Sequence, residues 1–152
     1  MKIQAKSKEV SVKFSLNSLI LLNANYIDDD GKSAKQRWHL IIKADEKKIK
    51  LLKITSRWKN YFFQSKLGLL KCLDKPSYVI HNRVLVLEIP SLVDTHKFRL
   101  CQIHQKGCLA KEKFTKIIQK LNKFWASEFS RDKKTIELNW NDLKGIRARI
   151  KK

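Results

Sequence analysis

The sequence predicts an α+β fold in which a curled antiparallel sheet is capped by one C-terminal amphipathic helix. Short apolar segments separated by turn residues fill the chain up to residue 104, which is typical of strands. Residues 111–129 instead have a helical period. The apolar face of that helix needs a partner, and the strands before it offer a sheet whose edge or mouth it can cover.

The helix has an apolar side and a basic side. Its apolar residues follow the spacing of one helix face: Phe114, Ile117, Ile118, Leu121, Phe124 and Trp125. The other side carries Lys113, Lys116, Lys120 and Lys123. These lysines form a strip roughly 15 Å long by helical rise. The strip is suited to a phosphate backbone, which it would contact without reading sequence, although a solvated helix face has the same spacing.

Length and charge restrict the function. The chain has 152 residues, of which 43% are hydrophobic, and this is enough for one core. We divide it into a domain over residues 10–129 and a basic C-terminal extension over residues 130–152. Thirty-four Lys and Arg against fourteen Asp and Glu give a charge of +20. This favours a polyanionic partner, duplex DNA before membrane, although the even spread of lysines also fits a generally lysine-rich protein.

The cysteines indicate a reduced compartment. The chain has an odd number of cysteines and no C-x-x-C pair; they are Cys72, Cys101 and Cys108. The residues after Met1 show no signal-peptide pattern. The longest apolar run, residues 19–22, is far shorter than a membrane span. We therefore expect an intracellular protein that is not in a membrane.

The first half of the domain reads as strands. Residues 10–14 alternate in polarity and residues 18–26 continue with a second apolar segment, after a loose arm over 1–9. Residues 28–31 are an Asp-Asp-Asp-Gly turn, and residues 38–43 are a strand.

Residues 49–54 are ambiguous. The alternation of Lys50, Leu52 and Ile54 fits a strand, whereas Leu51 and Trp58 lie at helical spacing. We favour a strand because four of the following residues, Thr55, Tyr61, Phe62 and Phe63, are of strand-prone types.

The second half continues the pattern. Residues 66–73 are an apolar segment that ends in the turn 74–77. Residues 78–80 and 83–89 are expected to be hairpin arms joined at His81 and Asn82, and the second arm is apolar on both faces, which places it deep in the sheet.

The remaining strands lie on either side of the helix. Residues 97–104 are the last strand before it, and residues 135–140 alternate again after it. The chain ends in a basic run, which we expect to contact DNA, to act as a nuclear-import signal, or to be disordered. Its basic residues are Arg147, Arg149, Lys151 and Lys152.

No catalytic or metal site is predicted from the cysteines, histidines or glycines. A zinc site is suggested by His96, Cys101, His104 and Cys108, which lie within thirteen residues. On one strand, however, Cys101 faces away from the two histidines, and the spacing fits no standard finger. The four glycines form no phosphate-cradling loop, so we expect a protein that is not an enzyme and has no cofactor.

One stretch resembles a nuclease signature. Residues 23–31 read N-A-N-Y-I-D-D-D-G, which is similar to the motif of LAGLIDADG homing endonucleases at Ala24, Ile27, Asp28, Asp30 and Gly31. The resemblance implies a metal ligand at Asp30 and a single-motif enzyme that acts as a dimer. Against it, Asn25 and Tyr26 stand where close helix packing needs small residues, and an ordinary Asp-Gly turn has the same sequence.

The order of apolar anchors also resembles a second family, over residues 10–129. The matching positions are Trp38, Leu52, Ile54, Tyr61, Phe62, Phe63, Gln64, Leu69, Leu70, residues 78–87, Phe98, Arg99, Leu100, Leu121, Phe124 and Trp125. They resemble the N-terminal pleckstrin-homology-like domain of the meiotic recombination accessory proteins of the "Rec one-fourteen" family, whose plant members are called poor homologous synapsis.

The resemblance implies a nuclear, non-enzymatic subunit of the machinery that makes programmed DNA double-strand breaks in meiosis. Family members bind DNA and use the sheet side of this domain to dock a peptide of the break-forming complex. The corresponding residues here are Arg83, Val84, Leu85, Val86, Leu87 and Phe98. The chain departs from the family because it has no long disordered middle and no C-terminal helix for the accessory partner. A phosphoinositide-binding domain of the same fold is a further alternative.

Overall fold

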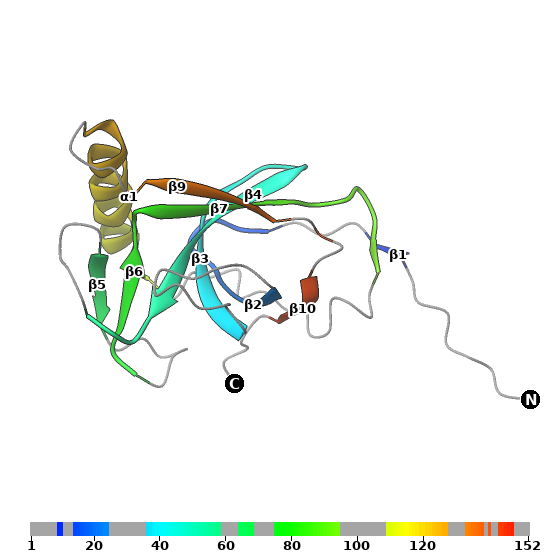
Figure 1. Cartoon of the computed structure of the whole chain (residues 1–152), viewed down its shortest axis with the longest axis horizontal. Coiled ribbons are helices and arrows are strands. Elements are labelled where there is room, and N and C mark those ends of the chain that lie inside the picture. The colour runs from blue at the N-terminus through cyan, green and yellow to red at the C-terminus, as the bar shows by residue number, and fades with distance from the viewer. Residues whose placement is uncertain are drawn as a thin grey trace, which may run out of the picture.

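The computed structural model describes residues 9–10, 14–24, 36–58, 64–68, 75–94, 109–127, 133–138, 140 and 143–147. Figure 1 labels its elements. They are β1 (Glu9–Val10), β2 (Leu19–Ala24), β3 (Gln36–Ala44), β4 (Lys48–Thr55), β5 (Gln64–Gly68), β6 (Ser77–Ile80), β7 (Arg83–Glu88), β8 (Val93–Asp94), α1 (Lys111–Ala126), β9 (Lys134–Leu138) and β10 (Leu143–Arg147).

Eight of these strands form one sheet, and α1 packs on it. Seven strands pair antiparallel, in the order β10-β2-β3-β4-β6-β5 with β7 also paired to β4, and β9 joins parallel to β7. The pair β1 and β8 is a separate two-stranded sheet. The predicted α+β class, with an antiparallel sheet and one C-terminal helix, is confirmed.

Strand β4 carries two partners in series along one side. Its first half pairs with β7, from Lys48 opposite Glu88 to Leu51 opposite Leu85. Its last residues pair with β6, with Ile54 opposite Val79. Beyond β4 the sheet therefore divides into two branches, one of β6 and β5 and the other of β7 and β9. The strand interpretation of residues 49–54 is confirmed.

The predicted hairpin at His81 and Asn82 is wrong. Neither arm pairs with the other, because β6 and β7 both pair with β4. A two-residue hairpin turn needs positive φ at its first residue, and among the described residues other than glycine only Asn17 has positive φ. A hairpin tip is also exposed, whereas His81 and Asn82 are 0% and 6% exposed. They form a buried bend between the two branches.

Three elements anchor to this bend. The indole Nε1 of Trp125 in α1 donates a hydrogen bond to the His81 carbonyl at 2.7 Å. Ser65 Oγ of β5 lies 2.6 Å from His81 Nε2. The backbone N–H of Lys134, where β9 begins, donates to the Asn82 carbonyl at 2.9 Å. The bend thus fixes α1, β5 and β9 relative to β4.

The sheet is open and not strongly curled, which corrects the predicted curl. Closure would require the end strands to pair with one another, and among the described residues β10, β5 and β9 each pair with one strand. Figure 1 shows α1 beside the end of the sheet where β5 and β6 lie. The helix therefore covers the division of the sheet and does not close a barrel.

The apolar face of α1 packs as its spacing predicted except at Phe124, which is half-buried outside the cluster with Lys133 Nζ 6.0 Å from its ring centroid. Ile117 and Leu121 are buried, and Phe114, Ile118 and Trp125 pack against the same cluster. Burying one large apolar side chain stabilises the fold by about 2 kcal/mol. The helix ends at Ala126, before the predicted residue 129, and Lys133 Nζ donates to the carbonyls of Trp125 and Ser127 at this end.

The opposite face of the sheet has its own core. Its buried members come from β2, β3, β4, β7 and β9 and from the residues that follow β7 and β9. They are Ile20, Leu22, Ile41, Ile49, Leu51, Leu85, Leu87, Ile89, Leu138 and Trp140. The segment assigned to a C-terminal extension therefore contributes β9, β10 and two core residues. Parallel strands need a long crossover, which the segment with α1 supplies between β7 and β9.

Other predicted elements fall partly or wholly outside the described residues. The turn at 28–31 and the strand at 97–104 are among them. Strand β1 covers only the start of the predicted strand 10–14, and Phe14 lies in no strand. Strand β5 begins before the predicted segment 66–73, whose residues 69–73 are not described.

Replacing Leu138 by Ala should lower the free energy of unfolding by about 2–4 kcal/mol, because the change removes a buried side chain from the core. Glu137→Ala, the exposed neighbour in β9, is the matched control and should change it by less than about 0.5 kcal/mol. Urea unfolding measures both. Equal effects of the two substitutions would show that β9 is not part of the core.

Candidate functional site

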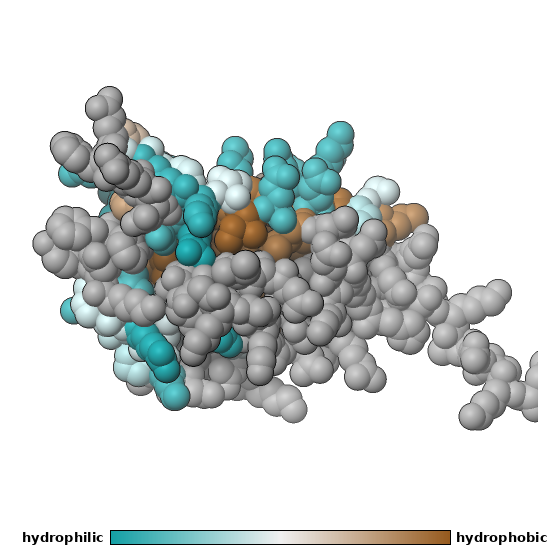
Figure 2. All heavy atoms as spheres, viewed as in Figure 1, coloured by the Kyte–Doolittle hydropathy of each residue, from teal (hydrophilic) through white to brown (hydrophobic). Residues whose placement is uncertain are grey.

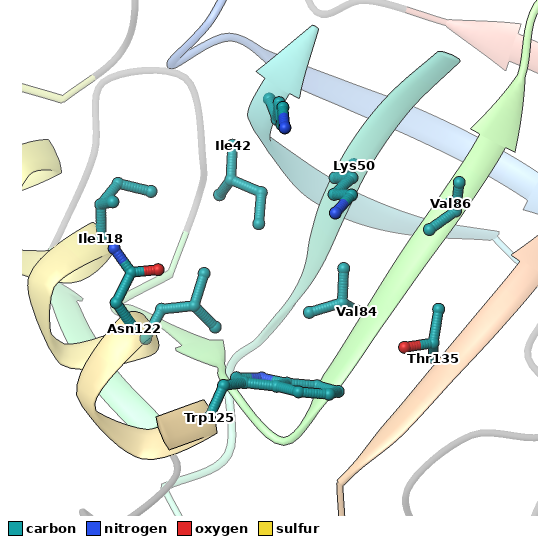
Figure 3. A pocket seen from close by; sticks show the side chains of 10 residues that line it. Ile42, Lys50, Val84, Val86, Ile118, Asn122, Trp125 and Thr135 are labelled. Carbon is teal, nitrogen blue, oxygen red and sulfur yellow. The ribbon is translucent and has the colours of Figure 1, made fainter. Parts of the chain in front are cut away.

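An apolar groove lies between α1 and the sheet (Figure 3). It has a volume of about 410 Å³ and is lined by residues of α1, β3, β4, β7 and β9. They are Ile42, Lys43, Lys50, Val84, Val86, Ile118, Leu121, Asn122, Trp125 and Thr135. In Figure 3, Ile118, Asn122 and Trp125 come from the helix, opposite Val84 and Val86 of the sheet.

Strand periodicity decides which residues of β7 reach this groove. Successive side chains point to opposite faces, so Val84 and Val86 line the groove whereas Leu85 and Leu87 lie in the other core. In β3 a register shift between Ile41 and Lys43 brings Ile42 and Lys43 both to the groove.

The rim of the groove is basic. Lys43 and Lys50 are directly opposite each other in β3 and β4, an arrangement that destabilises a sheet by like-charge repulsion. Among the described residues, the lining contains no acidic one. A bound anionic group would relieve the repulsion. Figure 2 shows hydrophobic residues along the part of the sheet where β7 and β9 lie, with hydrophilic side chains above them.

The predicted protein-binding residues are therefore divided. Val84 and Val86 line the groove, whereas Leu85 and Leu87 are buried in the opposite core. Arg83 is half-buried at the start of β7. Phe98 lies outside the described residues.

The four predicted lysines of α1 also separate into two groups, one bound to backbone carbonyls and one exposed. Lys113 Nζ donates to the Leu67 carbonyl at 2.6 Å, and Lys120 Nζ donates to the Gln64 carbonyl at 2.5 Å. Both carbonyls belong to β5, the edge strand of its branch, and the lysines satisfy groups that another chain could otherwise pair with. Lys116 and Lys123 are exposed. Burial lowers the pKa of Lys120.

The basic tail is only partly described. Arg147 ends β10, which pairs with β2, and the position of its side chain is not described. Arg149, Lys151 and Lys152 lie outside the described residues.

A second hollow, which we call the basic cleft, lies between β5 and α1. Its volume is about 680 Å³. Its lining consists of Trp58, Gln64, Ser65, Lys66, Ala110, Glu112, Lys113, Lys116, Ile117 and Lys120. The cleft thus gathers three of the four predicted helix lysines around a tryptophan.

Ser65 and His81 have the separation of a nucleophile and a base, 2.6 Å between Oγ and Nε2. If His81 accepted the serine proton, Nδ1 would carry hydrogen, yet Nδ1 is buried without a partner among the described residues. The other tautomer, in which Nε2–H donates to Ser65 Oγ, leaves no buried N–H unpaired. The hydrogen bonding therefore favours a structural role for Ser65 and His81 over a catalytic one.

The two buried histidines of the described residues, His39 and His81, are neutral at pH 7. Burial, with a smaller contribution from the Lys120 charge, lowers the pKa of His81 to about 4. Burial is also the main cause that lowers the pKa of His39 to about 3, and the charges of Lys53 and Arg37 add to it. His39 Nδ1–H donates to the Arg37 carbonyl at 2.9 Å, which opposes this shift.

Within the described part of the chain, no group of three or more His, Cys, Asp or Glu could hold a metal ion, and no helix is long and apolar enough to span a membrane. The zinc candidates His96, Cys101, His104 and Cys108 lie outside the described residues, as do Asp28 and Asp30.

No protein-family model and no curated protein matches the chain. The resemblance to the meiotic recombination accessory proteins and the similarity to the LAGLIDADG signature therefore stay predictions.

Several residues that line the two hollows are not among the site residues predicted from the sequence. Lys50 carried a signal, because it interrupts the apolar side of β4 that Leu52 and Ile54 continue. Thr135 and Lys43 carried no such sequence signal. Thr135 reaches the groove through the parallel pairing of β9, and Lys43 through the register shift in β3. The spacing of Trp58 from Leu51 indicates a helix face and gives no sign of a cleft.

Acid should destabilise the protein below pH 6.5. The unfolded chain then binds protons at His39 and His81, whereas the folded chain does not until about pH 3 and pH 4 respectively. The free energy of unfolding should fall by roughly 2 kcal/mol per histidine between pH 6.5 and pH 5, above the range in which most carboxylates titrate. Urea unfolding at several pH values measures the fall.

His81→Gln removes one of the two buried imidazoles and should make the dependence on pH about half as steep. Equal stability of the wild-type protein at pH 7 and pH 5 would contradict the neutral burial of the two imidazoles.

Proposed function

We propose that the protein is a non-enzymatic protein-interaction module that associates with DNA. The observation that carries the proposal is the apolar groove between α1 and β7. Two of the predicted protein-binding residues, Val84 and Val86, line it, and Trp125 and Ile118 supply the facing wall. Apolar walls with few polar groups at the rim are typical of binding sites.

The occupant that fits the groove is a short segment of another protein. A volume of about 410 Å³ takes a few side chains, which is the scale of peptide recognition. The opposed Lys43 and Lys50 call for acidic groups beside those side chains. We therefore propose a segment with apolar anchors flanked by Asp or Glu. A second copy of the chain fits less well, since it carries the same charge of +20.

DNA association is supported by charge. The chain carries +20, and Lys116 and Lys123 present exposed ammonium groups on α1. Contacts of this kind bind duplex phosphates without reading sequence and weaken with salt.

The family resemblance supports a more particular proposal. In it the chain is a nuclear accessory subunit of the meiotic break-forming machinery, its domain is pleckstrin-homology-like, and the groove takes the peptide of that complex. The open sheet is a departure from the curled sheet expected of such a domain.

Nothing in the described residues favours the nuclease alternative. A long helix from Asp45 would support that alternative, whereas the structure has a turn there and then β4. Ala24, the first matching position of the motif, is the last residue of β2.

A charge exchange tests the groove. The wild-type protein should bind a peptide with Phe and Leu between Glu residues, and should bind the same peptide with Lys in place of Glu at least tenfold more weakly, since like charges across an interface are costly. The double variant Lys43→Glu with Lys50→Glu should reverse this preference. Isothermal titration calorimetry measures the four affinities.

Lys47→Glu with Lys75→Glu, at two exposed positions outside the groove, is the matched control and should keep the wild-type preference. A preference for the Glu peptide that survives the exchange at Lys43 and Lys50 would place the acidic contact elsewhere.

The lysines of α1 should separate into two functional pairs. Lys116→Gln with Lys123→Gln should weaken duplex DNA binding and lower the slope of log affinity against log salt by about 2, without loss of stability. Lys113→Gln with Lys120→Gln should instead lower the urea midpoint, because the carbonyls of β5 lose their donors. Filter binding at several salt concentrations and urea unfolding measure the two effects.

If both double variants weakened duplex binding equally and neither changed stability, α1 would present the continuous strip that its sequence suggested.

A further inference from the structure

The basic cleft contains an exposed tryptophan. Trp58 is 40% exposed, and the other large hydrophobic side chains exposed among the described residues are the leucines Leu16 and Leu92. A partly exposed aromatic ring offers a flat apolar surface on which a planar ligand can stack. Trp58 lies in a hollow of about 680 Å³, in which it can cover a ligand on one side.

Two neighbours hold the ring in place. The Tyr78 ring lies 5.1 Å from it between centroids, tilted by 48°. Lys66 Nζ lies 5.4 Å from the Trp58 centroid, within the range of a cation–π contact. Because its neighbours restrict the ring, a stacking ligand has less ordering cost to overcome, and the exposed Lys66 ammonium moves off the ring when a base stacks there.

The charges around the ring attract phosphate. In the part of the chain that the structure describes, the cleft is lined by Lys66, Lys113, Lys116 and Lys120 against one acid, Glu112. Lys113 and Lys120 donate to carbonyls of β5, which leaves Lys66 and Lys116 as the exposed ammonium groups among the lining residues that the structure describes. These two positions flank the hollow from β5 and from α1.

We propose that the basic cleft binds single-stranded nucleic acid, with a base stacked on Trp58 and the adjoining phosphates on Lys66 and Lys116. An aromatic platform beside a positive groove is how proteins bind single strands with little sequence preference. In a duplex the bases are paired and stacked on one another, so the ring adds affinity only for an unpaired base. This inference deepens the DNA association proposed above and depends on it for the charge, but not for the stacking.

The test separates stacking from charge. Fluorescence anisotropy compares a labelled thymidine oligonucleotide of about 20 nucleotides, longer than the site of a single module, with an abasic strand of the same length. The wild-type protein should bind the thymidine strand roughly tenfold more tightly than the abasic strand. Trp58→Leu should lose this preference, with unchanged affinity for the abasic strand and for a duplex. Equal binding of the two strands by the wild-type protein would overturn the proposal.

Control variants locate the effect. Leu92→Ala removes an exposed apolar side chain outside the cleft and should leave all affinities unchanged. Trp58→Phe keeps a smaller stacking surface and should keep part of the preference for the thymidine strand. Such a result would show that misfolding is not the reason why Trp58→Leu loses the preference. If Trp58→Leu kept the full preference for the thymidine strand, the base would stack elsewhere and the proposal would fail.

Substitution of two lysines tests the phosphate contacts separately. Lys66→Gln with Lys116→Gln should weaken binding of both the thymidine and the abasic strand several-fold more than Lys47→Gln with Lys75→Gln, a matched pair of exposed lysines outside the cleft. Equal losses from the two pairs would remove the cleft from the proposal. A uridine strand of the same length then shows whether RNA or DNA is preferred.

The outcomes also separate this inference from the proposed function. Salt-sensitive duplex binding together with equal affinity for thymidine and abasic strands would support DNA association and overturn stacking at Trp58. A preference for the thymidine strand that depends on Trp58, with no duplex binding, would support the cleft and overturn the proposed duplex association.

Discussion

The buried bend at His81 and Asn82 is the constraint on which the rest of the structure depends. Strands β6 and β7 pair in series with β4, so the chain between them must leave the line of the strand while it stays inside the protein. Buried backbone groups need partners. The Trp125 indole and the Lys134 backbone N–H supply them at the two carbonyls.

The same bend places the two hollows on opposite sides of one helix. Since Trp125 holds α1 over the division of the sheet, the branch of β7 forms the apolar groove with it and the branch of β5 forms the basic cleft with it. The junction is not fully satisfied: His81 Nδ1 and Asn82 Oδ1 are buried without partners among the described residues. Each such atom costs about 1–3 kcal/mol, a kind of local conflict that proteins tolerate where function requires a geometry.

The sequence carried most of the fold, because the main elements have strong local periods. The helix from Lys111 and the side that Ile117 and Leu121 bury follow from spacing alone. Pairing over long distances does not. His81 and Asn82 have the composition of a turn, and only the presence of β4 as a shared partner makes them a bend. The parallel pairing of β9 likewise depends on a crossover that no local pattern records.

The candidate sites were less predictable for the same reason. The basic side of α1 was evident, but its rotation toward β5, which ties Lys113 and Lys120 to backbone carbonyls, is a property of packing. The alternation of β7 gave Val84 and Val86 together with Leu85 and Leu87, and only the position of α1 shows which pair faces the groove. Trp58 became a candidate when the structure placed Lys66 and Lys116 around it.

The central claim is that one helix separates two independent binding surfaces of different chemistry. The most direct test is a calorimetric titration of the protein with the thymidine strand, performed alone and again in the presence of a saturating concentration of the Glu-containing peptide. The account predicts binding in both titrations with the same stoichiometry. The two affinities should lie within about threefold of each other at a salt concentration that screens the negative charge added by the peptide. Loss of strand binding in the peptide-saturated protein would show that the two surfaces are not independent, and would contradict the account.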